Sequence, residues 1–295
     1  MNEENFEYLQ KRVFYTGFGN NLDAQLKTQM DKGDSSFTLV HNTQIGKDQV
    51  AATLHFSKSD RSDNYFFNRY DMLIVKEGKE NPLTQSFEIR YNNNMTFKQA
   101  YNLMNGRSVF KTFHKNVNEG TEEKPNWQPK GETYVAWRKL DPENIDDRGN
   151  MKYKQFTEGY GFDLQKALAE YPHPIKELEA PETKERLIQS LQDGNKQSVT
   201  VSIDGTELTR FIDADPQKGI STYKSYDQEV SEEQKQYWKE KKEAAKEKPA
   251  ENSQSAGSTK EIVDEAKKKA QMKQSSGKPR KRTPVKEGQG KGVKR

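Results

Sequence analysis

Residues 17–26 read GFGNNLDAQL and residues 159–168 read GYGFDLQKAL, so one pattern of glycines, a short polar residue and two leucines occurs twice. In each copy the leucines are four residues apart, which places them on one face of a helix. Asn21 and Asp163 precede these leucines and are typical N-cap residues, because their side chains accept hydrogen bonds from the first free amides. Each copy therefore predicts a helix that follows a tight glycine turn.

The similarity resumes further along both copies. Two apolar residues four apart, with a glycine three residues after the second, recur at Leu26, Met30 and Gly33 and at Leu187, Leu191 and Gly194. Each glycine is expected to end its helix in the left-handed conformation, which glycine adopts without steric penalty. We interpret the pattern as a structural duplication; the alternative is two generic helix-and-hairpin segments with ordinary caps.

The residues after each glycine predict antiparallel strands. These strands are expected at 36–42, 49–58, 64–76 and 85–91 in the first copy and at 197–203, 207–213 and 220–226 in the second. Asp204-Gly205 is a strong hairpin signal, because both central residues of a type I′ turn need positive φ. Between the copies, Thr96 and Gln99 have the spacing of a capping box, which predicts a helix that ends at Gly106.

The fold class that follows is α+β, with two related helix-plus-antiparallel-meander units, then solvated helices and a disordered basic tail. Within the middle of the chain, 107–113 is expected to form a strand, and 132–140 and 151–157 a hairpin around 147–150. The expected divisions are an N-terminal α+β domain (1–114), a linker loop (115–131), a second α+β domain with the repeated unit (132–228), a solvated charged helix (229–248), a linker (249–258), a short helix (259–273) and the disordered basic tail (274–295).

Charge is divided unevenly along the 295 residues. Residues 267–295 hold twelve lysines or arginines against one acid, a net +11, whereas the whole chain is only +4, which leaves −7 for residues 1–266. Such a basic segment is expected to bind DNA or RNA through the phosphate backbone without reading sequence. The alternatives are a solubilising tail, a protein-docking segment or attraction to anionic lipid. The expected nucleic-acid-binding residues are Lys267, Lys268, Lys269, Lys273, Lys278, Arg280, Lys281, Arg282, Lys286, Lys291, Lys294 and Arg295.

Composition narrows the remaining classes. The chain has no cysteine, which excludes disulfides and thiolate metal sites. No apolar run approaches the ~18 residues needed to span a bilayer, and the acidic N-terminus lacks a hydrophobic signal segment. We therefore expect a cytoplasmic protein that does not bind membranes and needs no cofactor.

Two histidines are candidates for a metal or catalytic pair. If 46–47 forms a two-residue turn, His41 lies opposite Ala52 and His55 lies opposite Thr38. Successive strand residues point to opposite faces, so the two imidazoles diverge. We expect both histidines to occupy ordinary sheet positions.

Three other motifs have a functional and a structural interpretation. Asp213 and Asp215 have a spacing seen at metal sites, but a strand that ends before Pro216 explains it equally. The two Gly-aromatic-Gly segments precede helices, where amides bind phosphate, yet neither is a complete phosphate-binding loop. The stretch 65–70 places aromatic residues on both faces of one strand. One face is expected to pack on helices, and the other to meet a second layer or partner, or to stack nucleobases beside Arg69.

Several stretches together resemble a family of uncharacterised proteins from bacterial conjugative transposons and related integrated elements. The similar stretches are 15–19 (YTGFG), 52–74 (ATLHFSKSDRSDNYFFNRYDMLI), 100–107 (AYNLMNGR), 160–164 (YGFDL) and 185–226, together with the Lys/Arg/Gly-rich C-terminus. The resemblance covers most of residues 5–228. It implies the setting of a mobile element and implies no catalytic residues.

The function expected from the sequence is that of a non-enzymatic accessory protein of a mobile genetic element. The α+β body would bind an unidentified protein partner, and the basic tail would bind nucleic acid. The alternative is a protein-interaction adaptor or inhibitor module with an incidental solubilising tail. Scattered histidines and the absence of cysteine argue against an enzyme.

Overall fold

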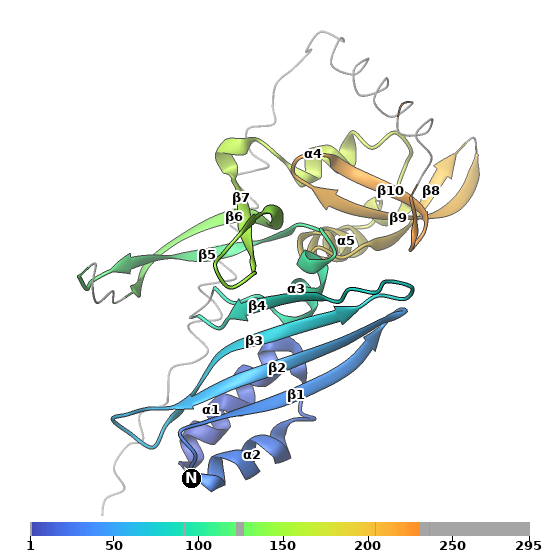
Figure 1. The fold of residues 1–295 in the computed structure, drawn as a ribbon. Helices are drawn as coiled ribbons and strands as arrows, with labels where there is room; N and C mark the ends of the chain where they lie inside the picture. The colour runs from blue at the N-terminus through green and yellow to red at the C-terminus, as the bar shows by residue number, and fades with distance from the viewer. Residues whose placement is uncertain (1, 91–92, 122–126, 204, 230–235, 237–295) are drawn as a thin grey trace, which may run out of the picture. The chain divides into compact units, whose positions relative to one another are not determined.

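A computed structural model describes residues 2–90, 93–121, 127–203, 205–229 and 236 (Figure 1). These residues all belong to one unit, Met1–Ser255, and form an α+β fold with three antiparallel sheets. The solvated helix predicted over 229–248 lies outside the described residues except at Glu229, which is in a strand, and at Gln236. The predicted linker, short helix and basic tail, with all twelve residues predicted to bind nucleic acid, lie outside them as well.

The first sheet is a meander with strand order β1-β2-β3-β4, covered on one face by helices. Its elements are α1 (Glu3–Val13), a π-helical turn (Phe14–Phe18), α2 (Asp23–Lys32), β1 (Ser36–Ile45), β2 (Asp48–Lys58), β3 (Tyr65–Val75) and β4 (Leu83–Glu88). Burial alternates along β1, where Phe37 and Leu39 face the helices. This alternation is what buries one face of the sheet and leaves the other face open.

The register of β1 and β2 confirms the predicted two-residue turn. His41 pairs with Ala52, and His55 pairs with Thr38. His41 packs at right angles to Phe97 on the helix side, whereas the Nε2 atom of His55 lies 2.6 Å from Asp71 on the other side. The imidazoles therefore diverge, as predicted.

A β-bulge in β3 changes how its aromatic residues divide between the two faces. His55 pairs with Arg69 and Phe56 pairs with Phe67, so Asn68 is an extra residue with no opposite residue in the β2 register. The bulge shifts the alternation by one, which brings Tyr70 to the helix side together with Tyr65 and Phe67. Of the four aromatic residues in 65–70, only Phe66 lies on the open face of the sheet, where it is 51% exposed. The predicted aromatic platform for nucleobases beside Arg69 is thus reduced to one ring.

A second sheet, with order β5-β6-β7, follows the helix α3. Its elements are α3 (Phe97–Met104), β5 (Val109–Asn118), β6 (Trp127–Ile145) and β7 (Met151–Thr157). The predicted capping box between Thr96 and Gln99 is confirmed, as is the hairpin of β6 and β7.

The loop predicted over 115–131 is wrong at both of its ends. Asn116 pairs with Pro129 and Asn118 with Trp127, so β5 and β6 continue as a hairpin beyond the region where strands were expected. The described side chains of 115–118 and 131–132 are exposed or half-exposed. Their polarity reflects contact with water and carries no signal of strand pairing, which is why composition predicted a loop.

The third sheet is a meander with order β11-β10-β9-β8, preceded by two helices. Its elements are α4 (Leu164–Ala169), α5 (Pro181–Gln192), β8 (Gln197–Ile203), β9 (Thr206–Asp215), β10 (Gly219–Ser225) and β11 (Gln228–Glu229). Ile203 pairs with Thr206, which confirms the hairpin predicted at Asp204-Gly205.

The two predicted helix entries differ. Asp163 caps α4 by accepting hydrogen bonds from the amides of Gln165 and Lys166, as predicted. Asn21 is not a cap, because α2 begins at Asp23 and its N-cap residue, Leu22, makes no side-chain bond. The chain reaches α2 through the π-helical turn instead. The predicted left-handed glycines are confirmed, with φ of 78° at Gly33 and 76° at Gly194.

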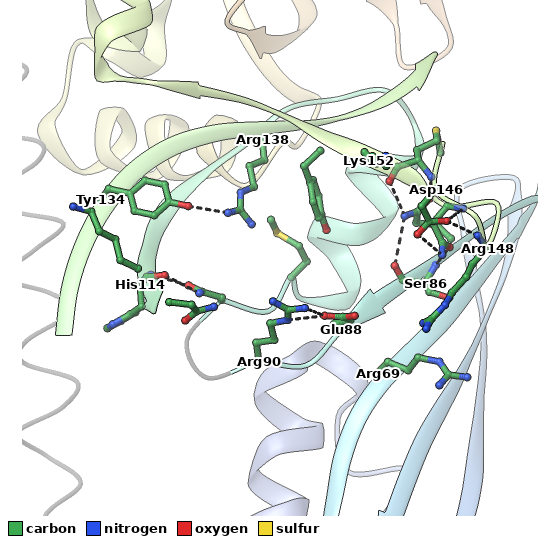
Figure 2. Close-up of a pocket in the computed structure, with 18 of the residues that line it drawn as sticks. Arg69, Ser86, Glu88, Arg90, His114, Tyr134, Arg138, Asp146, Arg148 and Lys152 are labelled. Atoms are coloured by element: carbon green, nitrogen blue, oxygen red, sulfur yellow. Dashed lines mark hydrogen bonds and ion pairs between the residues drawn. The ribbon is translucent and has the colours of Figure 1, made fainter. Parts of the chain in front are cut away.

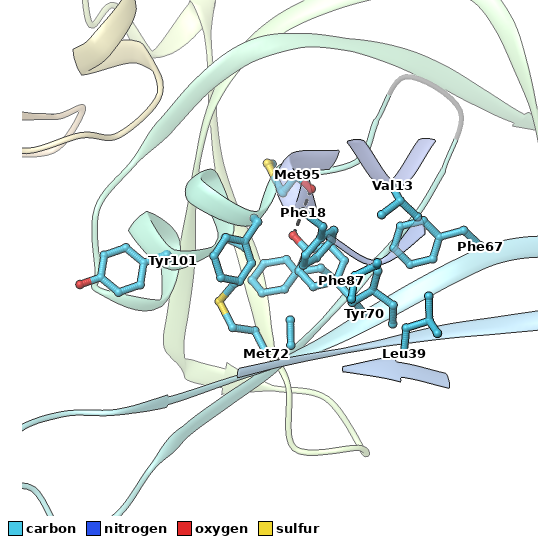
Figure 3. Packing of buried hydrophobic residues seen from close by; sticks show 14 of the residues in the cluster. Val13, Phe18, Leu39, Phe67, Tyr70, Met72, Phe87, Met95 and Tyr101 are labelled. Carbon is cyan, nitrogen blue, oxygen red and sulfur yellow. Dashed lines mark hydrogen bonds between the residues drawn. The ribbon is translucent and has the colours of Figure 1, made fainter. Parts of the chain in front are cut away.

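Two hydrophobic clusters share the second sheet. Ala136 and Leu140 of β6 join the cluster of the first sheet, which Figure 3 shows around Phe18, Tyr70 and Met72. Trp137 points to the other face and joins a cluster built with α4, α5 and the third sheet. Alternate residues of one strand therefore serve two cores, and the second sheet connects them.

Candidate anion-binding cleft

A cleft of about 1160 Å³ lies between β4 and the open part of the second sheet (Figure 2). One wall carries Arg69, Glu88 and Arg90 from β3, β4 and the residues that follow β4. The other wall carries Tyr134 and Arg138 from β6. Ala136 lies between these two along the strand and is buried, so the sheet passes from core to cleft along one face.

The turn between β6 and β7 closes one end of the cleft. The Gln85 side chain donates from Nε2 to the Met151 carbonyl at 3.1 Å and accepts from the Met151 amide at 2.9 Å. The Asn150 side chain accepts from the backbone amide of Ser86 at 2.9 Å. On β4 these bonds use the Gln85 side chain and the Ser86 backbone amide, and together they fix the turn against the outer edge of the first sheet.

Asp146 organises that turn. Its carboxylate accepts hydrogen bonds from the backbone amides of Arg148 at 2.9 Å and Asn150 at 2.8 Å. The amide of Asn150 is the main reason that the pKa of Asp146 is lowered. The negative charge of Asp146 is therefore committed to the turn, while the Arg148 side chain faces the cleft (Figure 2).

The opposite end is held by Asn93. Its side chain donates to the carbonyl of His114 at 2.9 Å and accepts from the amide of His114 at 2.7 Å. This pair of bonds imitates a strand partner for β5 and holds the residues after β4 beside the second sheet. Lys115 and Glu132 pair across β5 and β6 at 2.8 Å.

The lining of the cleft is basic. It contains six lysines or arginines, Arg69, Arg90, Lys115, Arg138, Arg148 and Lys152, and three acids, Glu88, Glu132 and Asp146. The lining therefore carries a net charge of +3. The acids are already engaged, since Glu88 pairs with Arg90, Glu132 pairs with Lys115, and Asp146 holds the turn. Arg148 and Lys152 form no ion pair with any residue that the structure describes.

Arg138 is the most constrained of these cations. Its Cζ atom lies 3.6 Å from the ring centre of Phe113 and 5.3 Å from that of Tyr153. Nε donates to Gln155 at 3.0 Å, and Nη2 donates to the Tyr134 hydroxyl at 3.0 Å. Cation–π contacts and two directional bonds hold the guanidinium in one orientation before any ligand arrives.

The aspartates predicted as a metal or strand-end pair have separate partners away from the cleft. Tyr223 donates to Asp213 at 2.9 Å, and burial raises the pKa of Asp213. Asp215, the last residue of β9, forms a buried ion pair with Lys139. Within the described ranges, no group of three His, Asp or Glu residues is placed to hold a metal ion. Across the same residues, no helix is both long enough and apolar enough to traverse a bilayer.

Sequence reasoning missed the cleft. The alternation of the strand expected at 132–140 already places Tyr134 and Arg138 on one face, so the sequence indicates one wall of the cleft. The opposing wall comes from residues some 45 to 70 positions earlier in the chain. Comparisons of the chain with protein-family models, curated proteins and solved structures find no match.

Proposed function

We propose that this protein is a non-enzymatic accessory protein that binds nucleic acid, with phosphate groups held in the cleft and along the basic C-terminal segment. The observation that carries the proposal is the +3 lining of the cleft in a chain whose first 266 residues carry −7. Locally concentrated positive charge attracts the phosphate backbone even when the surrounding surface is acidic. The resemblance implies the setting of a mobile element, and we propose that the protein acts in the cytoplasm.

Binding is favoured over catalysis by the state of the acids in the cleft. A general acid or base needs a carboxylate that is free to exchange a proton with a substrate. Glu88, Glu132 and Asp146 are each tied to a lysine, an arginine or backbone amides. What the cleft presents to solvent is a set of hydrogen-bond donors with positive charge.

We also propose that the first and third sheets are copies of one duplicated unit. In support, each is a four-stranded antiparallel meander preceded by a helix that ends at a left-handed glycine. Leu26 and Met30 of α2, like Leu187 and Leu191 of α5, are the buried residues of their helices. Superposition of the two units, with equivalent strands aligned in order, is the test of this interpretation.

One observation favours the alternative function of a protein-interaction module. Three aromatic side chains of α1 and the π-helical turn that follows it are exposed, Tyr8, Phe14 and Tyr15, the last by 75%. Exposed aromatic residues are common anchors of protein interfaces. A partner protein captured through this patch, by a chain that retains no nucleic acid, would favour the adaptor interpretation.

A salt titration tests the main proposal. We would compare full-length protein, a chain lacking 267–295, and the double variant Arg138→Gln/Lys152→Gln. Removing two phosphate contacts is expected to lower the slope of log affinity against log salt by about 1.4 to 1.8. Loss of the basic segment is expected to have a larger effect, because it removes more contacts.

The matched control is the double variant Lys184→Gln/Arg186→Gln. Both side chains are exposed on α5, and they remove the same charge outside the cleft. If the cleft variant titrates like this control, the cleft does not bind nucleic acid. If the chain lacking 267–295 binds as tightly as the full chain, the role of the basic segment is wrong.

A further inference from the structure

Arg138 has unused hydrogen-bonding capacity. An arginine carries five N–H groups in a planar fork. Gln155 takes the Nε hydrogen and Tyr134 takes one on Nη2, so three have no acceptor among the described residues, two on Nη1 and one on Nη2. Phe113 covers a face of the guanidinium, so an anion must approach in the guanidinium plane. Such an arrangement suits a group with two oxygens side by side, such as a phosphodiester.

A second aromatic ring lies close to the guanidinium of Arg138. Tyr153 lines the same cleft, is 40% exposed, and has its ring centre 5.3 Å from Cζ of Arg138. The Tyr134 ring is attached to the hydroxyl that accepts from Arg138, so it also borders the position of the anion. A ligand phosphate on Arg138 would therefore bring its neighbouring group against tyrosine.

We propose that the cleft binds single-stranded nucleic acid, with one phosphodiester on the open edge of Arg138 and an adjacent base against the ring of Tyr153. The proposal rests on the proposed function and specifies its ligand. In a duplex the base faces are stacked inside the helix, so the tyrosine ring would find no partner there. In a single strand both phosphates and base faces are available, and ring stacking adds to affinity without reading sequence.

The size of the cleft agrees with this ligand. Its volume of about 1160 Å³ is slightly above the range of roughly 300–1,000 Å³ that is usual for small-molecule sites. Cations stand on both walls and at the closed end, Arg90, Arg138 and Arg148. An extended anion that runs between the walls would meet each of them in turn.

The experiment uses the full-length chain with its twelve C-terminal lysines and arginines replaced by glutamine, so that the cleft dominates binding. The probe is a fluorescein-labelled DNA of mixed sequence and about 15 nucleotides, used single-stranded or annealed to its complement. Tyr153→Leu is expected to weaken single-strand affinity about ten-fold and to change duplex affinity by less than about two-fold. Arg138→Gln is expected to weaken both and to lower the salt slope by about 0.7 for the single strand.

Two further variants make the result independent of folding defects. Tyr160→Leu removes a ring that is similarly exposed but lies outside the cleft, and it is the matched control. Tyr153→Trp enlarges the ring and is expected to tighten single-strand binding alone, so it decides the question if Tyr153→Leu does not fold. Thermal melting of each variant reports folding.

The outcomes separate the two proposals. If the Tyr153 variants alter both probes equally, or alter neither, the single-strand inference is overturned. The proposed function then still stands, provided that Arg138→Gln weakens binding. If Arg138→Gln also has no effect on either probe, the role of the cleft in the proposed function fails as well.

Discussion

Two arginines, Arg107 and Arg138, are held in nearly the same way but have different surroundings. Each donates from Nε and Nη2 to oxygen acceptors and lies over an aromatic ring, Tyr101 for Arg107 and Phe113 for Arg138. The difference lies in where an acceptor comes from. Arg107 follows α3, and its Nε donates to the carbonyl of Gly194, which follows α5, so this bond joins two separate parts of the fold. Both acceptors of Arg138 belong to its own sheet.

We call the contact of Asn102 and Arg107 with residues 193–195 the joint, and its polar groups bond to one another. Asn102 donates to the Asp193 carbonyl at 2.7 Å and to Asn195 at 2.9 Å, and it accepts from Arg107 at 2.5 Å. Arg107 is only 8% exposed. Asn102 and Arg107 have buried partners across the joint and so hold two parts of the fold together. Arg138 has partners only on its own sheet, so its remaining N–H groups are available to a ligand.

The largest expected effect in this comparison is on stability, at Gly194. A Cβ atom there would lie 2.7 Å from the Ser108 carbonyl oxygen, and φ is 76°. Gly194→Ala is expected to lower the free energy of unfolding by about 3 kcal/mol, from the left-handed conformation and the clash together. Urea unfolding of the variant and the native chain measures this change in the free energy of unfolding. Gly33→Ala is the control, because its φ is 78° and no atom lies within 4 Å, so it should cost only about 1 kcal/mol. Equal losses would mean that close packing at the joint does not matter.

The next effect concerns the bonds of the joint. Asn102→Ala leaves the Asp193 carbonyl and a donor of Arg107 without partners in a buried place. The expected loss is about 2 kcal/mol in urea unfolding. Asn105→Ala removes a single bond to a carbonyl of the same helix and should cost about half as much. A loss at Asn102 no larger than at Asn105 would contradict the closed joint.

A smaller stability effect is expected at Arg138. Its bonds to Gln155 and Tyr134 are partly exposed and stay on one wall. Arg138→Gln is expected to change the free energy of unfolding by less than about 1 kcal/mol, while it weakens nucleic-acid binding. Arg107→Gln should show the reverse, with a loss of about 2 kcal/mol and no change in binding while the protein is folded. If both variants lose the same stability, the distinction between joint and cleft is wrong.

The sequence reveals the local part of this picture. Asp163 as a cap, Gly33 and Gly194 as left-handed helix ends, and the turn at 46–47 all depend on a few neighbouring residues. The bulge at Asn68 was missed, because an extra residue leaves no mark in composition. It alone decides that Tyr70 is buried.

The contacts that make the site and the joint are distant in sequence. Asn102 and Asp193 are 91 residues apart, and Ser86 and Asn150 are 64 apart. Gly194 was predicted for its backbone angle, but its close approach to Ser108 depends on how the end of α5 packs against the start of β5. No periodicity or cap records that packing, so neither the joint nor the cleft follows from the pattern of residues.

The smallest expected effect concerns a third arginine, Arg69, which lies on the other wall of the cleft. Nε of Arg69 lies 3.4 Å from Asp71, which also accepts from Ser86 and contacts His55. Burial opposes the charge of Asp71, but the bond from Ser86 and the contacts of His55 and Arg69 outweigh it and lower the pKa of Asp71.

A lowered pKa means that Asp71 stabilises the fold above its unfolded pKa and loses that contribution as pH falls through its folded pKa. Its side chain is 39% exposed, so solvent screening limits the cost of Asp71→Asn to about 0.5 kcal/mol at neutral pH. Urea unfolding over a series of pH values should show this difference from the native chain disappearing as pH falls through the folded pKa of Asp71. Asp31→Asn, exposed on α2 with no ion pair among the described residues, removes the same charge elsewhere and is the matched control for this series. Asp71→Asn also releases Arg69 toward the cleft, so the nucleic-acid affinity of this variant at neutral pH should rise slightly. A fall in affinity would show that Asp71 holds Arg69 in its binding position.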